Sequence, residues 1–175
     1  LRISVVGGTT DEMVYRWRAG PNAISEPLRA IGLEIDRVRA NSDLVIALTH
    51  LGLDSDRKIA HGTRGVDLVI GGHSHDALYY PVMERGRSGF DVPIFQAGKH
   101  GQSVGQLWLD MEKGRAPKIL SYTLVPVYAE GPREGAMQSF VTYARRRLEH
   151  EFGVSRLYEV IGRSDVPMRA PVNGD

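Results

Sequence analysis

The sequence predicts an α/β fold in which parallel strands are followed by an antiparallel pair. A continuous apolar run at 44–48 and a second predicted strand at 66–70 flank a helical segment, and such a repeat of roughly 30 residues is typical of a βαβ unit with a right-handed crossover. Farther along, apolar and polar residues alternate at 106–111 and a second extended stretch covers 119–127, which favours antiparallel strands with one exposed face. A length of 175 residues with 42% hydrophobic side chains suits a folded domain with a sizeable core.

The first predicted elements are a strand and an amphipathic helix. Residues 2–6 are rich in β-branched side chains and run into Gly7 and Gly8, which indicates a strand that enters a turn. The next element is a helix whose expected N-cap is Ser25 and which ends at residues 41–42. Its apolar side chains recur at intervals of three or four residues, as in a helix with one buried face: Leu28, Ile31, Ile35 and Val38.

A buried strand and a short helix form the first half of the predicted βαβ unit. The run at 44–48 is continuously apolar and ends just before His50, so a strand buried on both faces is expected. Residues 54–61 predict a short helix with Asp54 or Ser55 as its N-cap.

The remaining elements extend to the end of the chain. The strand predicted at 66–70 continues into the sequence Gly-Gly-His-Ser-His at 71–75. A short strand is expected at 92–96, an amphipathic helix at 135–152, and a last strand at 158–163.

Composition excludes several classes of function. The 22 basic and 21 acidic residues give a net charge of +1, so no charge excess favours a nucleic-acid partner. No apolar run reaches the ~18–20 residues of a membrane-spanning helix. The chain has no cysteine, which means that any metal must be bound by nitrogen and oxygen.

Three histidines follow the two predicted parallel strands. His50 comes directly after the first strand, and His73 and His75 come after the second. The carboxyl ends of parallel strands meet at one edge of a sheet, where ligands bind in open α/β folds. In extended backbone, residues two apart point to the same side. The three imidazoles therefore predict a metal site, although a lone histidine at a strand end is more often an ordinary polar residue.

Residues beside these histidines have predicted supporting roles. Gly71 and Gly72 carry no side chain where a ligand or a second metal would approach the backbone. Asp76 either orients a histidine from behind or simply forms a turn. Asp54 and Asp56 are assigned to helix capping rather than to metal binding.

These residues carry a resemblance to a known family. The segments Thr-His-Leu-Gly at 49–52, Gly-Val-Asp-Leu-Val-Ile-Gly-Gly-His-Ser-His at 65–75, Pro-Ile-Phe-Gln-Ala at 93–97 and a glycine-rich stretch at 101–105 follow in order. Together they resemble the second half of the catalytic domain of the 5′-nucleotidase and UDP-sugar hydrolase family of calcineurin-like metallophosphoesterases, over roughly 1–128.

The resemblance implies half of a four-layer α/β/β/α sandwich with mixed sheets, in an enzyme that holds two divalent metal ions such as zinc or manganese. It implies that His50 and His73 ligate one metal and that His75 lies by the other. The family's upstream Asp-x-His and Gly-Asn-His motifs do not occur in this chain, which opens with Leu1, and a Gly-Asp pair occurs only at 174–175, after the other motifs. The catalytic residues are therefore expected upstream of Leu1, and the chain alone is expected to be inactive.

The resemblance also implies a domain organisation. Residues 1–128 correspond to the C-terminal half of the catalytic domain, 129–155 to a linker with a helix, and 156–175 to the start of the family's C-terminal domain. The expected partners are a nucleotide or another phosphate-ester substrate, together with the absent N-terminal half and C-terminal domain. The residues themselves do not indicate where in the cell the protein is located. The resemblance favours the periplasm or the cell exterior.

Several functions remain open at this point. The main hypothesis is hydrolysis of the phosphate ester of nucleotides by the intact enzyme. The same scaffold in related proteins acts on cyclic nucleotides, UDP-sugars or thiosulfate. A third hypothesis is a small, non-catalytic domain in which three histidines and one water hold a metal.

Overall fold

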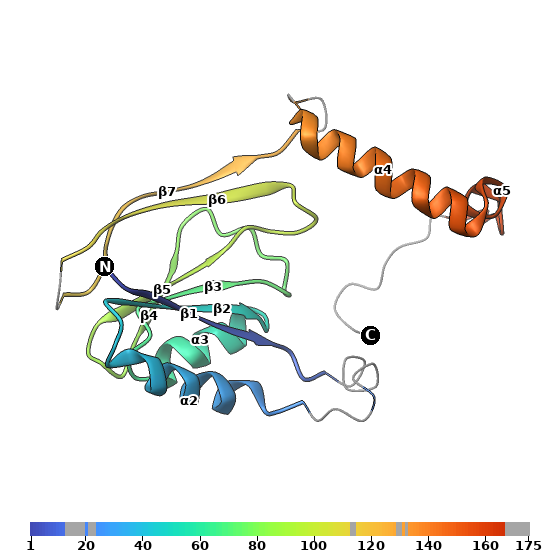
Figure 1. Cartoon of the computed structure of the whole chain (residues 1–175). Coiled ribbons are helices and arrows are strands. Elements are labelled where there is room, and N and C mark those ends of the chain that lie inside the picture. Colours follow the sequence, from blue (N-terminus) through green and yellow to red (C-terminus); the bar gives the residue numbers. More distant parts are fainter. Residues whose placement is uncertain (13–19, 21–23, 113–114, 129–130, 132, 167–175) are drawn as a thin grey trace. The chain divides into compact units, whose positions relative to one another are not determined.

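A computed structural model describes residues 1–12, 20, 24–112, 115–128, 131 and 133–166. The chain divides into two compact units, Leu1–Ala129 and Glu130–Asp175, which are described separately. The first unit contains seven strands and two helices in the described ranges (Figure 1), in chain order β1 (Ile3–Thr9), α2 (Pro27–Arg39), β2 (Leu44–His50), α3 (Leu53–Gly62), β3 (Leu68–Gly71), β4 (Val82–Arg85), β5 (Asp91–Gln96), β6 (Ser103–Asp110) and β7 (Lys118–Pro126).

The larger sheet has five strands in the order β1-β2-β3-β5-β4. Strands β1, β2, β3 and β5 are parallel, and β4 is antiparallel to β5 at one edge. Strands β6 and β7 form a separate antiparallel ribbon. The predicted α/β class, the parallel pair at 44–70 and the antiparallel pair are therefore confirmed, whereas β4 was not anticipated.

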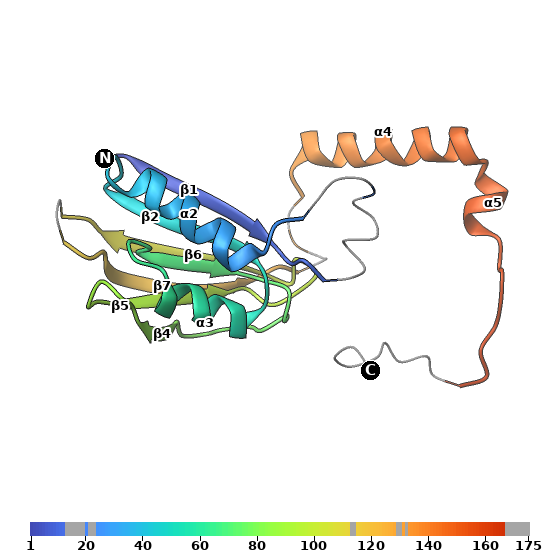
Figure 2. The same cartoon turned by 90° about the horizontal axis from the view of Figure 1, so that it is seen from below.

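Helices and ribbon lie on opposite faces of the five-stranded sheet. Helices α2 and α3 cover one face (Figures 1 and 2), where Ile31, Ile35 and Ile59 pack with the strand residues Val45 and Val69. The ribbon covers part of the other face, over Leu44, Leu68 and Phe95. The central strands are thus covered by the helices on one face and partly by the ribbon on the other. This burial explains why their sequences contain continuous apolar runs. The layers are α/β/β, as expected for part of the four-layer sandwich.

The ribbon of β6 and β7 leaves part of the five-stranded sheet uncovered on the face where it packs. Leu48, Ile70 and Phe95 lie in one row across β2, β3 and β5. Phe95 is 3% exposed, but Ile70 is 37% and Leu48 is 49% exposed, and Val5 on β1 is more open still. The apolar surface of the sheet thus extends beyond the area that β6 and β7 cover.

The predicted turn at Gly7 and Gly8 is wrong, because β1 continues through both residues to Thr9. A Cβ atom added to Gly8 would lie 2.2 Å from Cδ1 of Ile31 on α2. Gly8 therefore allows the helix to approach the strand closely, which is a second common reason for glycine inside a strand.

The predicted N-caps are also wrong. In α2 the cap is Glu26 rather than Ser25, and its carboxylate accepts hydrogen bonds from the backbone N–H groups of Leu28 and Arg29. Helix α3 begins at Leu53 after Gly52, which has no side chain to cap the helix. Glu26 shows that a longer acidic side chain can satisfy the same free N–H groups that Ser or Asp usually bind.

The second unit contains α4 (Gly135–Phe152) and α5 (Val154–Tyr158). The predicted helix at 135–152 is confirmed, but the predicted strand at 158–163 is wrong: α5 ends at Tyr158, and 159–164 form no strand. The Tyr158 hydroxyl donates to Glu149 at 3.1 Å, and its ring lies under the Arg145 guanidinium. These contacts hold Tyr158 against α4. Of the segment 156–175, which was assigned to the start of a C-terminal domain, residues 167–175 lie outside the described residues.

No helix in the described ranges is long and apolar enough to cross a lipid bilayer.

Tyr122→Phe is expected to stabilise the protein. The Tyr122 hydroxyl is buried under the ribbon and has no hydrogen-bond partner in the described part of the chain, while its ring packs on Phe95 with centroids 4.7 Å apart. An unsatisfied buried polar group costs about 1–3 kcal/mol, so removing it should raise the free energy of unfolding by about 1 kcal/mol. Urea unfolding measures this, with the exposed Tyr80→Phe as a control. A loss of stability would show that the hydroxyl is hydrogen-bonded in solution.

Candidate functional site

His50 and His73 meet at the carboxyl edge of the parallel strands. His50 is the last residue of β2, and His73 follows the end of β3 by two residues. Their ring centroids are 5.0 Å apart in an edge-on arrangement, with an interplanar angle of 73°. The backbone N–H of Gly52 donates to the carbonyl of Gly72 at 2.9 Å, which ties the segments after β2 and β3 together. This part of the sequence prediction, the proximity of the two histidines, is confirmed.

The His73 ring is held on three sides. Its backbone has a φ of 84°, in the region that residues other than glycine rarely adopt. A Cβ atom on Gly52 would lie 3.6 Å from His73 Cδ2, so the ring packs over that glycine. Its Nε2 lies 2.9 Å from Glu12 Oε1, beyond the end of β1, and the His50 ring lies on its remaining side.

His75 does not join this pair. Its ring contacts His100 instead, with centroids 5.7 Å apart, and its backbone φ is 64°. In the part of the chain that the structure describes, no three His, Asp or Glu side chains are grouped so that they could hold a metal ion. The structure therefore brings two of the three predicted imidazoles together, and the role of His75 as a ligand stays a prediction.

A buried polar network lies directly beneath this edge. Asp56 on α3 is fully buried, and its carboxylate accepts hydrogen bonds from Thr49 Oγ1 at 2.6 Å and from Gln96 Nε2 at 2.9 Å. Burial raises the pKa of the Asp56 carboxyl, while the two hydrogen bonds and the nearby His50 act in the opposite direction. Asp56 thus joins α3 to the ends of β2 and β5, and its predicted role as a helix cap is wrong.

Sequence reasoning missed this network although one signal was present. Asp56, Ile59 and Ala60 are spaced as residues of one helix face, and all three are buried. A carboxylate on an apolar helix face must find hydrogen-bond donors, because an unpaired buried charge is very costly. That spacing indicated a buried acid, but it could not reveal that Thr49 and Gln96 are its partners.

Gly71 and Gly72 leave room for the side chains of Asp56 and His50. A Cβ atom on Gly71 would lie 1.9 Å from Asp56 Oδ2, and one on Gly72 would lie 3.3 Å from His50 Nδ1. Both glycines therefore let the backbone of the edge approach the site residues closely. The approach of a ligand or a second metal at these positions stays a prediction.

Asp76 connects to the segment between the histidines. Its Oδ2 accepts a hydrogen bond from Ser74 Oγ at 2.6 Å. The same hydroxyl accepts from the backbone N–H of Leu53 and lies 3.2 Å from Gln96 Oε1. Asp76 is thus tied through Ser74 to the network of Asp56.

Comparison with known proteins identifies the family. No family model matches the chain. A 5′-nucleotidase from Diplobatis ommata is 34% identical over 132 residues, which are 67% of this chain and 23% of that protein. The chain belongs to the 5′-nucleotidase family. It spans about a quarter of the length of this 5′-nucleotidase relative.

Solved structures agree with this family and fold. A 5′-nucleotidase precursor from Thermus thermophilus has a TM-score of 0.59 and 27% identity, over 74% of this chain and 29% of its own. The sulfate thiohydrolase SoxB from Thermus thermophilus has a TM-score of 0.64 over 86% of this chain and 27% of its own. Its identity of 23% shows a common fold alone.

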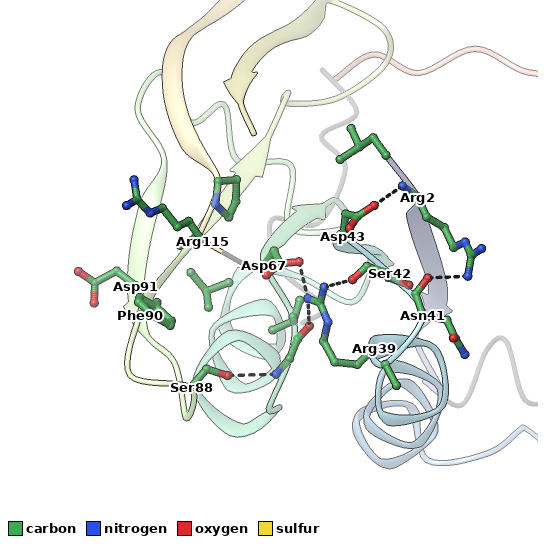
Figure 3. A pocket seen from close by; sticks show the side chains of 17 residues that line it. Arg2, Arg39, Asn41, Ser42, Asp43, Asp67, Ser88, Phe90, Asp91 and Arg115 are labelled. Carbon is green, nitrogen blue, oxygen red and sulfur yellow. Dashed lines mark hydrogen bonds and ion pairs between the residues drawn. The ribbon is translucent and has the colours of Figure 1, made fainter. Parts of the chain in front are cut away.

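A cavity of about 810 Å³ in this 5′-nucleotidase family chain lies at the opposite end of the strands (Figure 3). Its lining includes Arg39, whose guanidinium donates to Asp67 Oδ2 at 2.6 Å and to the carbonyl of Gly65 at 3.0 Å. Asp67 also accepts from the backbone N–H of Val45. These interactions join the end of α2 to the starts of β2 and β3. None of the predicted site residues lines this cavity.

Proposed function

We propose that this chain is part of a dimetal phosphoesterase that hydrolyses the phosphate ester of nucleotides, as its 5′-nucleotidase relatives suggest by name. The single observation that supports this most strongly is the edge-on pair of His50 and His73 at the carboxyl ends of β2 and β3. Two imidazoles at a ligand-binding sheet edge provide donors that zinc, manganese and related ions accept.

The residues present fit part of such a metal centre. His50 and His73 would ligate one divalent ion, and His75 would lie by a second. The described residues hold no complete group of three ligands, so further ligands would come from elsewhere. Bound divalent ions would supply an activated water and neutralise charge on the phosphate. Within this chain, Glu12 contacts the His73 ring, and Asp56 holds Thr49, the residue that precedes His50.

We assign the remaining ligands and the catalytic residues to the part of the family's length that this chain does not match. The open apolar face around Val5, Leu48 and Ile70 supports a further segment of protein beside the ribbon, because large contiguous apolar surfaces usually mark an interface. A location in the periplasm or outside the cell is proposed on the resemblance alone.

Zinc titration of the 175-residue chain tests the metal site. The chain should bind Zn²⁺ or Mn²⁺ weakly, and His50→Ala or His73→Ala should lower the affinity by about a hundredfold or more. His150→Ala, an exposed histidine on α4, is the matched control and should bind like the wild type. Isothermal titration calorimetry gives these affinities. Equal affinity in all four proteins would contradict the assignment of His50 and His73.

Activity assays test the substrate class. The chain alone should release no phosphate from 5′-AMP, because it lacks the remaining ligands. A longer protein that includes the upstream part of the family should hydrolyse 5′-AMP in preference to a cyclic nucleotide, a UDP-sugar or a thiosulfate conjugate. Robust 5′-AMP hydrolysis by the 175-residue chain would contradict the proposed division of the site.

A further inference from the structure

Glu12 lies in a segment that is anchored to the candidate site at two points. Thr10, just after β1, is buried, and its backbone N–H donates to the carbonyl of His50 at 3.0 Å. The backbone N–H of Glu12 then donates to Thr10 Oγ1 at 3.2 Å. The end of β1 is therefore fixed to the residue that carries one of the paired imidazoles, and Glu12 follows directly from that anchor.

The Glu12 side chain returns to the other imidazole. Its Oε1 lies 2.9 Å from His73 Nε2. An ionised carboxylate can only accept hydrogen bonds, so His73 Nε2 must be the donor. In a neutral imidazole one nitrogen carries the proton and the other keeps a lone pair. With the proton on Nε2, the lone pair of His73 is on Nδ1.

We propose that Glu12 is a positioning residue that holds His73 in the Nε2–H tautomer, so that Nδ1 is the nitrogen available to a divalent cation. The choice of cation as ligand rests on the proposed function. A carboxylate on the second nitrogen fixes both the tautomer and the ring orientation of a metal-binding histidine. Gly52 and His50 restrict the same ring by packing. Among the residues that the structure describes, Glu12 is the one that forms a hydrogen bond with a nitrogen of this ring.

Nitrogen-15 correlation spectra of the imidazole rings in the 175-residue chain test this directly. At about pH 8.5, where imidazoles are mostly neutral, His73 should show a protonated Nε2 and a bare Nδ1. Glu12→Ala should give a mixture of both tautomers. Glu12→Gln keeps an oxygen that can accept from Nε2 and should largely restore the wild-type pattern. A purely structural role of Glu12 would not change which nitrogen carries the proton.

Zinc provides a second readout in the same samples. Zn²⁺ should shift the His73 Nδ1 signal. The affinity of the chain for Zn²⁺ should fall by roughly 10–100-fold in Glu12→Ala and less in Glu12→Gln. Asp54→Asn is the matched control, because it removes one exposed negative charge from the start of α3 near the same edge. It should leave the His73 tautomer unchanged.

The outcomes separate this proposal from the proposed function. A wild-type His73 protonated on Nδ1, or a Glu12→Ala spectrum identical to the wild type, would overturn the role of Glu12 and leave the metal site standing. Zinc bound through Nε2 would also overturn it. A tautomer that depends on Glu12, in a chain whose His73 signals do not respond to zinc, would support the positioning role and refute the proposed metal centre.

Discussion

Gly71→Ala should lower the free energy of unfolding by about 3 kcal/mol and the melting temperature by roughly 10 °C. The new Cβ would lie 1.9 Å from Asp56 Oδ2 and 2.9 Å from Gln96 Nε2. Neither group can withdraw into solvent, because both residues are buried. The carboxylate would have to move away from Thr49 or Gln96, and the abandoned donor would stay buried without a partner. Thermal and urea unfolding of the 175-residue chain measure the loss.

The matched control is Gly62→Ala. Gly62 is the last residue of α3, and a Cβ there meets no atom within 4 Å. Alanine is favoured over glycine in helices by up to about 1 kcal/mol, so this variant should be as stable as the wild type or slightly more stable. Equal stability of the Gly71 and Gly62 variants would mean that the Asp56 network rearranges without cost, and that Gly71 does not depend on it.

The strands of the central sheet could be predicted because the signal is local. Residues 44–48 and 68–70 are continuously apolar, since α2 and α3 cover one face of these strands and the ribbon covers part of the other. Once two strands are parallel, the residues after them share one edge. The proximity of His50 and His73 follows from that topology, without knowledge of any side-chain conformation.

The position of His75 could not be predicted because the assumed backbone does not occur. Residues two apart share a side only in extended backbone, but His73 and His75 have φ values of 84° and 64°. The chain turns at both residues, and the ring of His75 ends beside His100. Conformations with positive φ at histidine depend on the surrounding structure, and the sequence pattern contains no sign of them.

The roles predicted for Asp56 and Gly8 were wrong for a related reason. A residue's type predicts its most frequent role, such as an N-cap for Asp or a turn for Gly. Their actual roles depend on residues distant in the sequence: Gln96 is 40 positions from Asp56, and Gly8 faces Ile31. Long-range partners of this kind are set by the packing of α2 and α3 on the sheet, which the local pattern does not describe.

Asp56→Asn should change how stability depends on pH. Burial raises the pKa of the Asp56 carboxyl above its ordinary value of about 3.9. Below about pH 4 this group is protonated in both the folded and the unfolded chain. As the pH rises from there, the unfolded chain releases its proton first, because the folded chain resists ionisation. The contribution of Asp56 to stability is therefore largest at acidic pH and is lost as the pH rises through its folded pKa.

Asparagine is similar in size and does not ionise, so the variant isolates this effect. The free energy of unfolding of the wild type minus that of Asp56→Asn should decrease as the pH is raised above about 4, by at most about 1.4 kcal/mol per pH unit. Urea unfolding at a series of pH values gives this difference, and ionisation of the other carboxyls cancels from it. The exposed Asp54→Asn on the same helix is the control for losing one charge from α3. A difference that increases with pH would show that the hydrogen bonds from Thr49 and Gln96 outweigh burial, so that folding lowers the pKa of Asp56 instead of raising it.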